Sequence, residues 1–271
     1  MRIAHTIREE MQEGLSHEGA GPILFKSLWE EADFQTPWVF VHAAILLPGG
    51  GIGQHRHDNS EEIFVTIDNA AQFTHNGRTT EIVGGAAVPS RSGESHAIYN
   101  HTDRETRFFN FHVVSTDCRG ICTDFHDARV NVPLESTDRL PIGRFDRNLL
   151  HYQKLHEGKG EVGSREIWGP QDFQTNFGYL VHCLLPPHTS IGYHQHETIE
   201  ECYIIMNGSG RMTVDDETQE ICPGDAIPNR LGGVHGLYNH TQENLELFIV
   251  AVCLEKGKID SADLRDDLSQ R

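Results

Sequence analysis

The sequence is poor in basic residues, in cysteine and in long apolar runs. Its 271 residues include 22 Lys and Arg against 40 Asp and Glu, a formal net charge of −18. A surface this acidic repels phosphate groups, which argues against nucleic acids and anionic membranes as partners. No stretch approaches the roughly 18 apolar residues of a membrane span, and the first residues lack the apolar centre of a signal peptide. We therefore expect a cytoplasmic protein.

Because cysteines are few, we do not expect disulfide bonds to stabilise the fold. The six cysteines of a cytoplasmic protein are expected to be reduced thiols. Cys118 and Cys122 lie four residues apart, which differs from the Cys-x-x-Cys spacing of a redox motif. We interpret them as two independent thiols, with a redox pair as the alternative.

Length and turn residues indicate a β-rich chain of two domains. Domains usually contain about 100–200 residues, so a chain of 271 residues suits two modest domains. The 26 Gly and 11 Pro imply many turns, which favours short strands over a helical bundle.

An internal repeat indicates where the two domains lie in the chain. Residues 16–113 align without a gap on residues 155–252, and 33 of these 98 positions are identical. The strongest matches are His17-Glu18-Gly19 with residues 156–158 and Asp33-Phe34-Gln35-Thr36 with residues 172–175. The chain is therefore a duplication, and residues of about 115–148, which lie outside the repeat, are expected to form the linker.

Within each copy the pattern favours strands. Apolar and β-branched residues cluster at residues 38–47 and 62–67, and again at 179–185 and 201–206. Asn76-Gly77 predicts a tight hairpin turn, and Asp215-Asp216 takes its place in the second copy. We expect one short helix over residues 7–15 and a charged tail over residues 256–271 that is helical or frayed.

Each copy contains the same group of histidines and glutamates. The first has His55 and His57, then Glu62 after Glu61, and later His96; the second repeats this spacing with His194, His196, Glu201 and His235. Alternate side chains of a strand point to one face, so the paired histidines share a face. A carboxylate and a further histidine from later strands can complete a four-ligand cluster. Accidental histidine pairs are common, but this arrangement occurs twice at identical spacing.

These motifs resemble the cupin superfamily. Residues 192–208 are similar to the first cupin motif, and residues 224–239 are similar to the second, with two extra residues before His235. The first copy matches as well, except that Asn69 stands where the motif ends in Gly, which leaves the type of that turn open.

The resemblance implies an all-β bicupin with two tandem jelly-roll (double-stranded β-helix) barrels and a short N-terminal helix. We predict an N-terminal cupin domain over residues 1–125 and a C-terminal one over residues 126–271. Each domain is expected to bind one divalent transition metal ion through three histidines and one glutamate. Fe(II) is favoured, with Mn(II), Ni(II), Cu(II), Co(II) and Zn(II) as alternatives. The implied ligands are His55, His57, Glu62, His96, His194, His196, Glu201 and His235.

Three further residues are candidates for catalysis. Arg91 and Arg230 occupy matching positions before the third histidine, where they would bind an anionic substrate or, more simply, form structural salt bridges. His112 and Asn110 alternate in the last strand of the first copy, where the second copy has Ala251 and Ile249. The first pocket is therefore predicted to be the more polar one.

The resemblance leaves the reaction open among three classes. A metal-dependent dioxygenase acting on a small oxygen-rich or aromatic molecule is preferred. A non-redox isomerase, decarboxylase or hydrolase is the second hypothesis, and a non-enzymatic binding protein of the pirin or storage type is the third. The sequence also leaves open whether copies of the chain associate. Because its motif turns are intact, we expect the second copy to be the reaction site.

Overall fold

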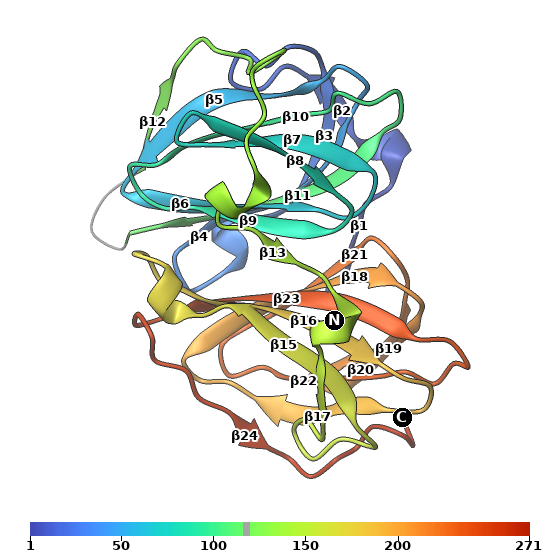
Figure 1. Cartoon of the computed structure of the whole chain (residues 1–271). Coiled ribbons are helices and arrows are strands. Elements are labelled where there is room, and N and C mark those ends of the chain that lie inside the picture. Colours follow the sequence, from blue (N-terminus) through green and yellow to red (C-terminus); the bar gives the residue numbers. More distant parts are fainter. Residues whose placement is uncertain (116–119) are drawn as a thin grey trace.

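The computed structural model describes residues 1–115 and 120–271 and shows two β-structured halves packed face to face (Figure 1). Each half consists of a larger and a smaller antiparallel sheet that enclose a barrel-like core. This all-β architecture of two jelly rolls confirms the expected fold class.

In the N-terminal half, neighbouring strands of a sheet are mostly not consecutive in the sequence, so the chain crosses between the two sheets. Within the described residues its larger sheet contains, in spatial order, β13 (Gly143–Arg144), β9 (Ala86–Ser90), β6 (Ser60–Thr66), β11 (Thr106–Val114), β4 (Trp38–Leu46), β3 (Ile23–Glu30) and β2 (Gln12–Gly14). Its smaller sheet contains β12 (Ile121–Asp124), β5 (Gly51–Asp58), β10 (Ser95–Tyr99), β7 (Ala70–His75) and β8 (Arg78–Val83).

The C-terminal half repeats this arrangement. Its larger sheet contains β1 (Ala4–His5), β21 (Asp225–Asn229), β18 (Ile199–Asn207), β23 (Leu245–Cys253), β16 (Phe177–Leu185), β15 (Val162–Trp168) and β14 (His151–Gln153). Its smaller sheet contains β20 (Glu217–Ile221), β19 (Gly210–Val214), β22 (Val234–Tyr238), β17 (Ser190–Gln195) and β24 (Ala262–Asp263).

The predicted hairpin turns have the required backbone. Asn76 and Gly77 both have positive φ (50° and 74°) between β7 and β8, and Asp215 and Asp216 (47° and 67°) do the same between β19 and β20. Consecutive left-handed residues match the twist of the flanking strands. Asn69 is left-handed as well (φ 50°), and its side-chain amide donates to Thr102, Thr106 and the Arg104 carbonyl. The turn that departs from the cupin motif is thus held by its own side chain.

The described residues contain little helix. The expected helix over residues 7–15 is wrong: the segment forms only a single 3-10 turn, η1 (Arg8–Glu10), followed by strand β2. The other 3-10 turns are η2 (Glu31–Asp33), η3 (Thr137–Arg139), η4 (Arg147–Leu149) and η5 (Pro170–Asp172). The tail does not form a helix either, because it contains β24 and buries Leu268. None of these turns has the length or apolar character needed to cross a bilayer.

The structural repeat is longer than the sequence repeat. β1, η1 and β2 are each matched by an element exactly 139 residues later, namely β13, η4 and β14, and the first of these lies within the stretch expected to be a linker. Asp124 in β12 corresponds in the same way to Asp263 in β24. Sequence identity outside residues 16–113 is too low to reveal this.

The first strand of each copy joins the sheet of the other copy. β1 pairs with β21 through Ala4 and Ala226, and β13 pairs with β9 through Gly143 and Ala87. This reciprocal exchange closes an exposed edge of each larger sheet.

The two larger sheets face each other, and their outer faces form one shared core. Phe109 and Phe111 of β11 pack edge-to-face against Phe248 of β23, with ring centroids 6.0 and 5.7 Å apart. Trp38 is fully buried against Phe177 in the same layer. Because side chains alternate along β11, its other residues point into the N-terminal barrel. Both faces of the central strands of the larger sheets, such as β6 and β23, are therefore buried.

Candidate functional site

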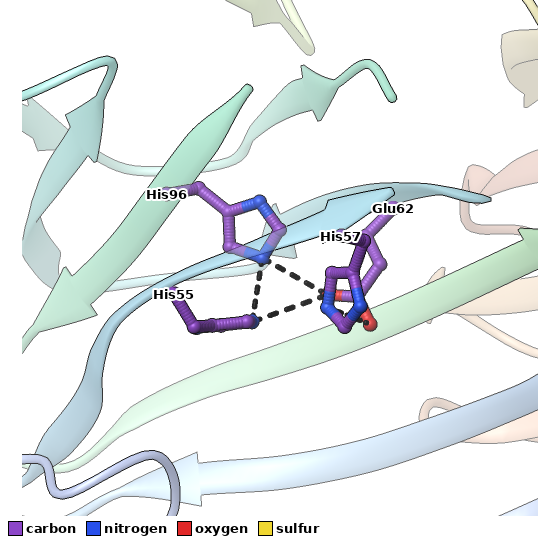
Figure 2. A group of neighbouring side chains, drawn as sticks. All are labelled: His55, His57, Glu62 and His96. Carbon is purple, nitrogen blue, oxygen red and sulfur yellow. Dashed lines mark hydrogen bonds and ion pairs between the residues drawn. The ribbon is translucent and has the colours of Figure 1, made fainter. Parts of the chain in front are cut away.

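Four candidate ligands converge inside the N-terminal barrel. His55 and His57 come from β5, Glu62 from β6 and His96 from β10, and all four side chains are buried (Figure 2). The Nε2 atoms of His55 and His96 lie 2.8 Å apart, and His96 Nε2 is 3.2 Å from Glu62 Oε2. His57 Nε2 is 3.4 Å from Glu62 Oε1 and has no hydrogen-bond partner. A convergent set of nitrogen and carboxylate donors suits a transition metal ion.

The C-terminal barrel brings together the corresponding four residues. His194 and His196 come from β17, Glu201 from β18 and His235 from β22. His235 Nε2 lies 2.7 Å from Glu201 Oε2, and His196 Nε2 lies 3.5 Å from it. The structure thus places both predicted ligand sets in buried clusters of the same composition.

Hydrogen bonds prepare one histidine of each cluster for metal binding. The Nδ1 atoms of His55 and His194 lie 2.8 Å from the carbonyl oxygens of Gly53 and Gly192. A ring nitrogen that donates to a carbonyl leaves the other nitrogen with a free lone pair. Burial and the nearby His96 lower the pKa of His55 to about 2, so the ring is neutral at pH 7.

The cluster carboxylates are ionised. Burial alone would raise the pKa of Glu62, but the imidazoles of His57, His96 and His112 hold it well below its usual range. The pKa of Glu201 is also lowered, because the neighbouring imidazoles of His196 and His235 outweigh burial. Neutral imidazoles and one carboxylate are the protonation states that a divalent cation requires.

Each cluster is backed by a further histidine that sequence reasoning matched but did not use. His17 stacks on His55 with ring centroids 3.7 Å apart, and His156 stacks on His194 at 3.6 Å. Asp124 lies 2.6 Å from His17 Nδ1, and Asp263 lies 2.8 Å from His156 Nδ1. The shared His-Glu-Gly sequence was a signal for this support, but the aspartates come from strands that showed no recognisable repeat.

The row of residues beside the clusters differs between the halves. Across the larger N-terminal sheet, Phe40, His112 and Glu62 are direct neighbours in adjacent strands. The same register places His42 beside Asn110. In the C-terminal half these positions are occupied by Tyr179, Val181, Ile249 and Ala251.

A cavity opens beside the N-terminal cluster. It has a volume of about 270 Å³ and reaches His55, His57 and Glu62. Its polar wall includes His112, as the sequence suggested, together with Asn110 and His42. Its apolar wall consists of Leu15, Ile23, Phe25, Phe40, Ala44, Ile52, Phe64 and Phe108. Burial lowers the pKa of His112 to about 4 and also lowers that of His42, so both rings are neutral.

The C-terminal cluster is covered by a tyrosine. The hydroxyl of Tyr179 donates to Glu201 Oε1. Burial and this carboxylate raise the pKa of Tyr179 well above its usual range, which keeps the hydroxyl protonated. A cavity thus lies beside the first cluster, and Tyr179 occupies the equivalent position beside the second, so the expectation that the second copy is the reaction site stays a prediction.

The structure does not bring Arg91 or Arg230 to the clusters. Neither residue lines the cavity. Arg91 Nε donates over 2.5 Å to the carbonyl of Asp172 in the other half, and Arg230 lies close enough to Asp33 to lower the pKa of that carboxyl. Both arginines thus lie at the interface between the halves, which fits the structural alternative better than substrate binding.

Glu61 and Glu200, which precede the cluster glutamates, also serve this interface. Glu61 accepts hydrogen bonds from the backbone nitrogens of Gln174 and Thr175 at 2.9 and 2.6 Å. Glu200 accepts from Gln35 and Thr36 at 2.9 and 2.8 Å. The repeated Asp-Phe-Gln-Thr segments are therefore the partners of these carboxylates, and strand alternation explains why neighbouring glutamates face opposite sides.

The thiols have no disulfide partner among the described cysteines. Cys122, Cys183, Cys202, Cys222 and Cys253 are free. Cys118, and with it the proposed pairing with Cys122, lies outside the described residues. Cys122 Sγ is 3.8 Å from His17 Nδ1, and burial raises the pKa of the Cys122 thiol to about 11.

Comparisons with known proteins agree with this architecture. A profile of the cupin domain matches residues 181–252. The oxalate-binding protein of Thermotoga maritima is 29% identical over 100 residues, which cover 37% of this chain and 83% of that protein.

Solved structures resemble both halves together. A variant of the salicylate 1,2-dioxygenase of Pseudoaminobacter salicylatoxidans in complex with gentisate superposes with a TM-score of 0.65 at 13% identity, covering 84% of this chain and 74% of that chain. A variant of Bacillus subtilis oxalate decarboxylase has a TM-score of 0.64 at 15% identity and covers 96% of this chain and 79% of that chain. At these identities the likeness concerns the fold.

Proposed function

Because this chain belongs to the cupin superfamily and is a bicupin, we propose that it is a metal-dependent enzyme that binds a small molecule in its N-terminal cavity. The observation that carries this proposal is a cavity of about 270 Å³ whose inner wall includes His55, His57 and Glu62. A neutral polar wall and an apolar wall around a buried donor cluster are typical of small-molecule sites.

Each half would hold one divalent transition metal ion through its three histidines and one glutamate. The orphaned Nε2 atoms of His57 and His196 support this assignment, because a buried nitrogen without a partner is costly. When bound, the ion supplies Lewis acidity and, in the case of Fe(II), redox chemistry with O₂. We favour Fe(II), with Mn(II), Ni(II), Cu(II), Co(II) and Zn(II) as alternatives.

The cavity residues supply orientation and exclude water. Phe40 and Phe64 flank the cluster on the apolar side. Asn110 Nδ2 donates to Glu62 Oε2 over 3.2 Å and so fixes the carboxylate. His112 Nδ1 lies 3.5 Å from the other Glu62 oxygen. Holding a reactant in a fixed orientation is one of the larger contributions that a protein makes to catalysis.

Among the reaction classes we favour a dioxygenase acting on a small aromatic or oxygen-rich molecule. The phenylalanines that line the cavity support a ring-shaped substrate, since aromatic side chains prefer stacked or edge-to-face partners. A non-redox isomerase, decarboxylase or hydrolase and a non-catalytic binding protein are the alternatives.

Oxygen uptake distinguishes these classes. Protein loaded anaerobically with Fe(II) is mixed with a panel of phenols and diols in an oxygen-electrode cell, and the products are analysed in parallel. Oxygen uptake that requires both Fe(II) and substrate is expected. Substrate conversion without oxygen uptake would assign the protein to the non-redox class, and ligand binding without any conversion would make it a binding protein.

A further inference from the structure

The amide of Asn110 has a defined orientation beside the N-terminal cluster. Its side chain, on β11, is only 8% exposed and lines the cavity. Glu62 is an ionised carboxylate and can only accept hydrogen bonds. The amide nitrogen must therefore face Glu62 Oε2, at 3.2 Å, and the amide oxygen faces elsewhere. Asn110 Oδ1 has no hydrogen-bond partner.

Neighbouring polar atoms are unpartnered as well. Both ring nitrogens of His112, which is also 8% exposed, have no hydrogen-bond partner. Leaving a buried polar atom unsatisfied costs about 1–3 kcal/mol. Unpartnered atoms grouped in one cavity wall therefore point to a ligand that completes their hydrogen bonds. For Asn110 Oδ1 the missing partner is a donor, because a carbonyl oxygen can only accept.

The rest of the wall limits the charge and shape of that ligand. The described residues that line the cavity include no lysine or arginine, and Glu62 is their one carboxylate. A charge placed away from the cluster would lose its hydration without gaining a counter-ion. A cavity of about 150 Å³ accommodates benzene, so about 270 Å³ is sufficient for one substituted ring.

We propose that the N-terminal cavity selects a single-ring phenol that is uncharged away from the metal-binding end and carries a hydroxyl donating to Asn110 Oδ1. Two adjacent oxygens of this molecule would face the cluster. An acceptor-only dianion such as oxalate would place lone pairs against Asn110 Oδ1 and is disfavoured. This inference rests on the proposed function and makes Asn110 a residue that determines specificity.

Equilibrium binding tests the inference without turnover. Isothermal titration calorimetry is performed anaerobically on Zn(II)-loaded protein with catechol, pyrogallol and oxalate. Pyrogallol offers the same pair of adjacent hydroxyls as catechol and one additional donor. We expect pyrogallol to bind about fivefold more tightly than catechol, as one neutral hydrogen bond allows. Both should bind at least about tenfold more tightly than oxalate.

Variants assign the difference to Asn110. Asn110→Ile introduces the residue found at the matching position of the other half, and it should abolish the advantage of pyrogallol over catechol. Asn110→Thr retains an acceptor and should restore part of this advantage. Ile249→Val is the matched control in β23 and should leave all three affinities unchanged. Zinc content and near-ultraviolet circular dichroism check that each variant is folded.

The outcomes separate the two proposals. Metal-dependent binding in which oxalate equals or exceeds pyrogallol, or in which Asn110→Ile weakens all three ligands equally, overturns the inference and leaves the proposed function intact. If none of the three ligands binds in a metal-dependent manner, the proposed function fails as well.

Discussion

The two halves of the chain carry the same candidate ligands but surround them differently. His55, His57 and Glu62 border a cavity, whereas Glu201, which corresponds to Glu62, is covered by the Tyr179 hydroxyl. Three of the four candidate ligands of the first half lie on β5 and β10 of the smaller sheet, whereas the cavity residues that differ between the halves lie on β4 and β11 of the larger sheet. The comparison teaches that the candidate ligands and the cavity wall are encoded by different strands, so one set can change while the other is retained.

The largest expected effect separates the halves by turnover. His55→Ala combined with His57→Ala should reduce kcat/KM at least about 100-fold, because it removes two ligands beside the cavity. His194→Ala combined with His196→Ala should mainly lower Tm. The measurement is oxygen uptake together with thermal unfolding. Equal loss of turnover in both folded variants would show two working sites and break the comparison.

The second prediction concerns Glu61 and Glu200, the glutamates that each half contributes to the interface between the halves. In Glu61→Gln one carboxylate oxygen becomes an amide nitrogen that faces the backbone donors of Gln174 and Thr175, so we expect a loss of about 3 kcal/mol in the free energy of unfolding. Glu200→Gln should cost only about 1 kcal/mol, because all of the Glu200 contacts fall on Oε2, and the amide nitrogen can replace Oε1, which has no hydrogen-bond partner. Urea unfolding monitored by circular dichroism measures both. Equal losses would contradict this difference between the two glutamates.

Acid should affect the N-terminal half through His112, which the other half replaces with Ala251. Because the folded pKa of about 4 is below the unfolded value of about 6.5, His112 destabilises the metal-free fold increasingly as pH falls from 6.5 to 4. At pH 5 this amounts to about 2 kcal/mol.

His112→Ala should therefore lose less stability than the wild type between pH 7.5 and pH 5. The comparison of two pH values removes the constant cost of the cavity that the variant leaves behind. Urea unfolding of metal-free protein at both values is the measurement, and an unchanged pH dependence would show that His112 is not held neutral.

The smallest effect tests whether the Tyr179 hydroxyl is what distinguishes the surroundings of Glu201 from those of Glu62. Phe40→Tyr places the same hydroxyl beside Glu62 and should weaken catechol binding about tenfold, since the new hydrogen bond must be broken. Tyr179→Phe should leave catechol binding unchanged and lower the free energy of unfolding by about 1 kcal/mol. If Phe40→Tyr binds catechol normally, the hydroxyl at this position does not control ligand binding.

Much of the fold followed from local rules. The repeat at an offset of 139 residues, the period-two alternation of His55 with His57 and the Asn76-Gly77 turn each depend on residues close together in the chain. The same alternation makes Glu61 and Glu62 face opposite sides of β6. The predicted helix over residues 7–15 was wrong because β2 pairs with β3, a tertiary contact that outweighs helix propensity.

The sequence by itself therefore determined the jelly-roll pattern, the duplication and the residues of the two clusters, because strand periodicity assigns each side chain to a face. Tertiary structure alone decided which face meets which partner. It placed Arg91 against Asp172, exchanged β1 and β13 between the halves, and positioned Tyr179 over Glu201. These contacts join residues far apart in the chain, and their formation depends on how two sheets close and pack, which no local pattern records.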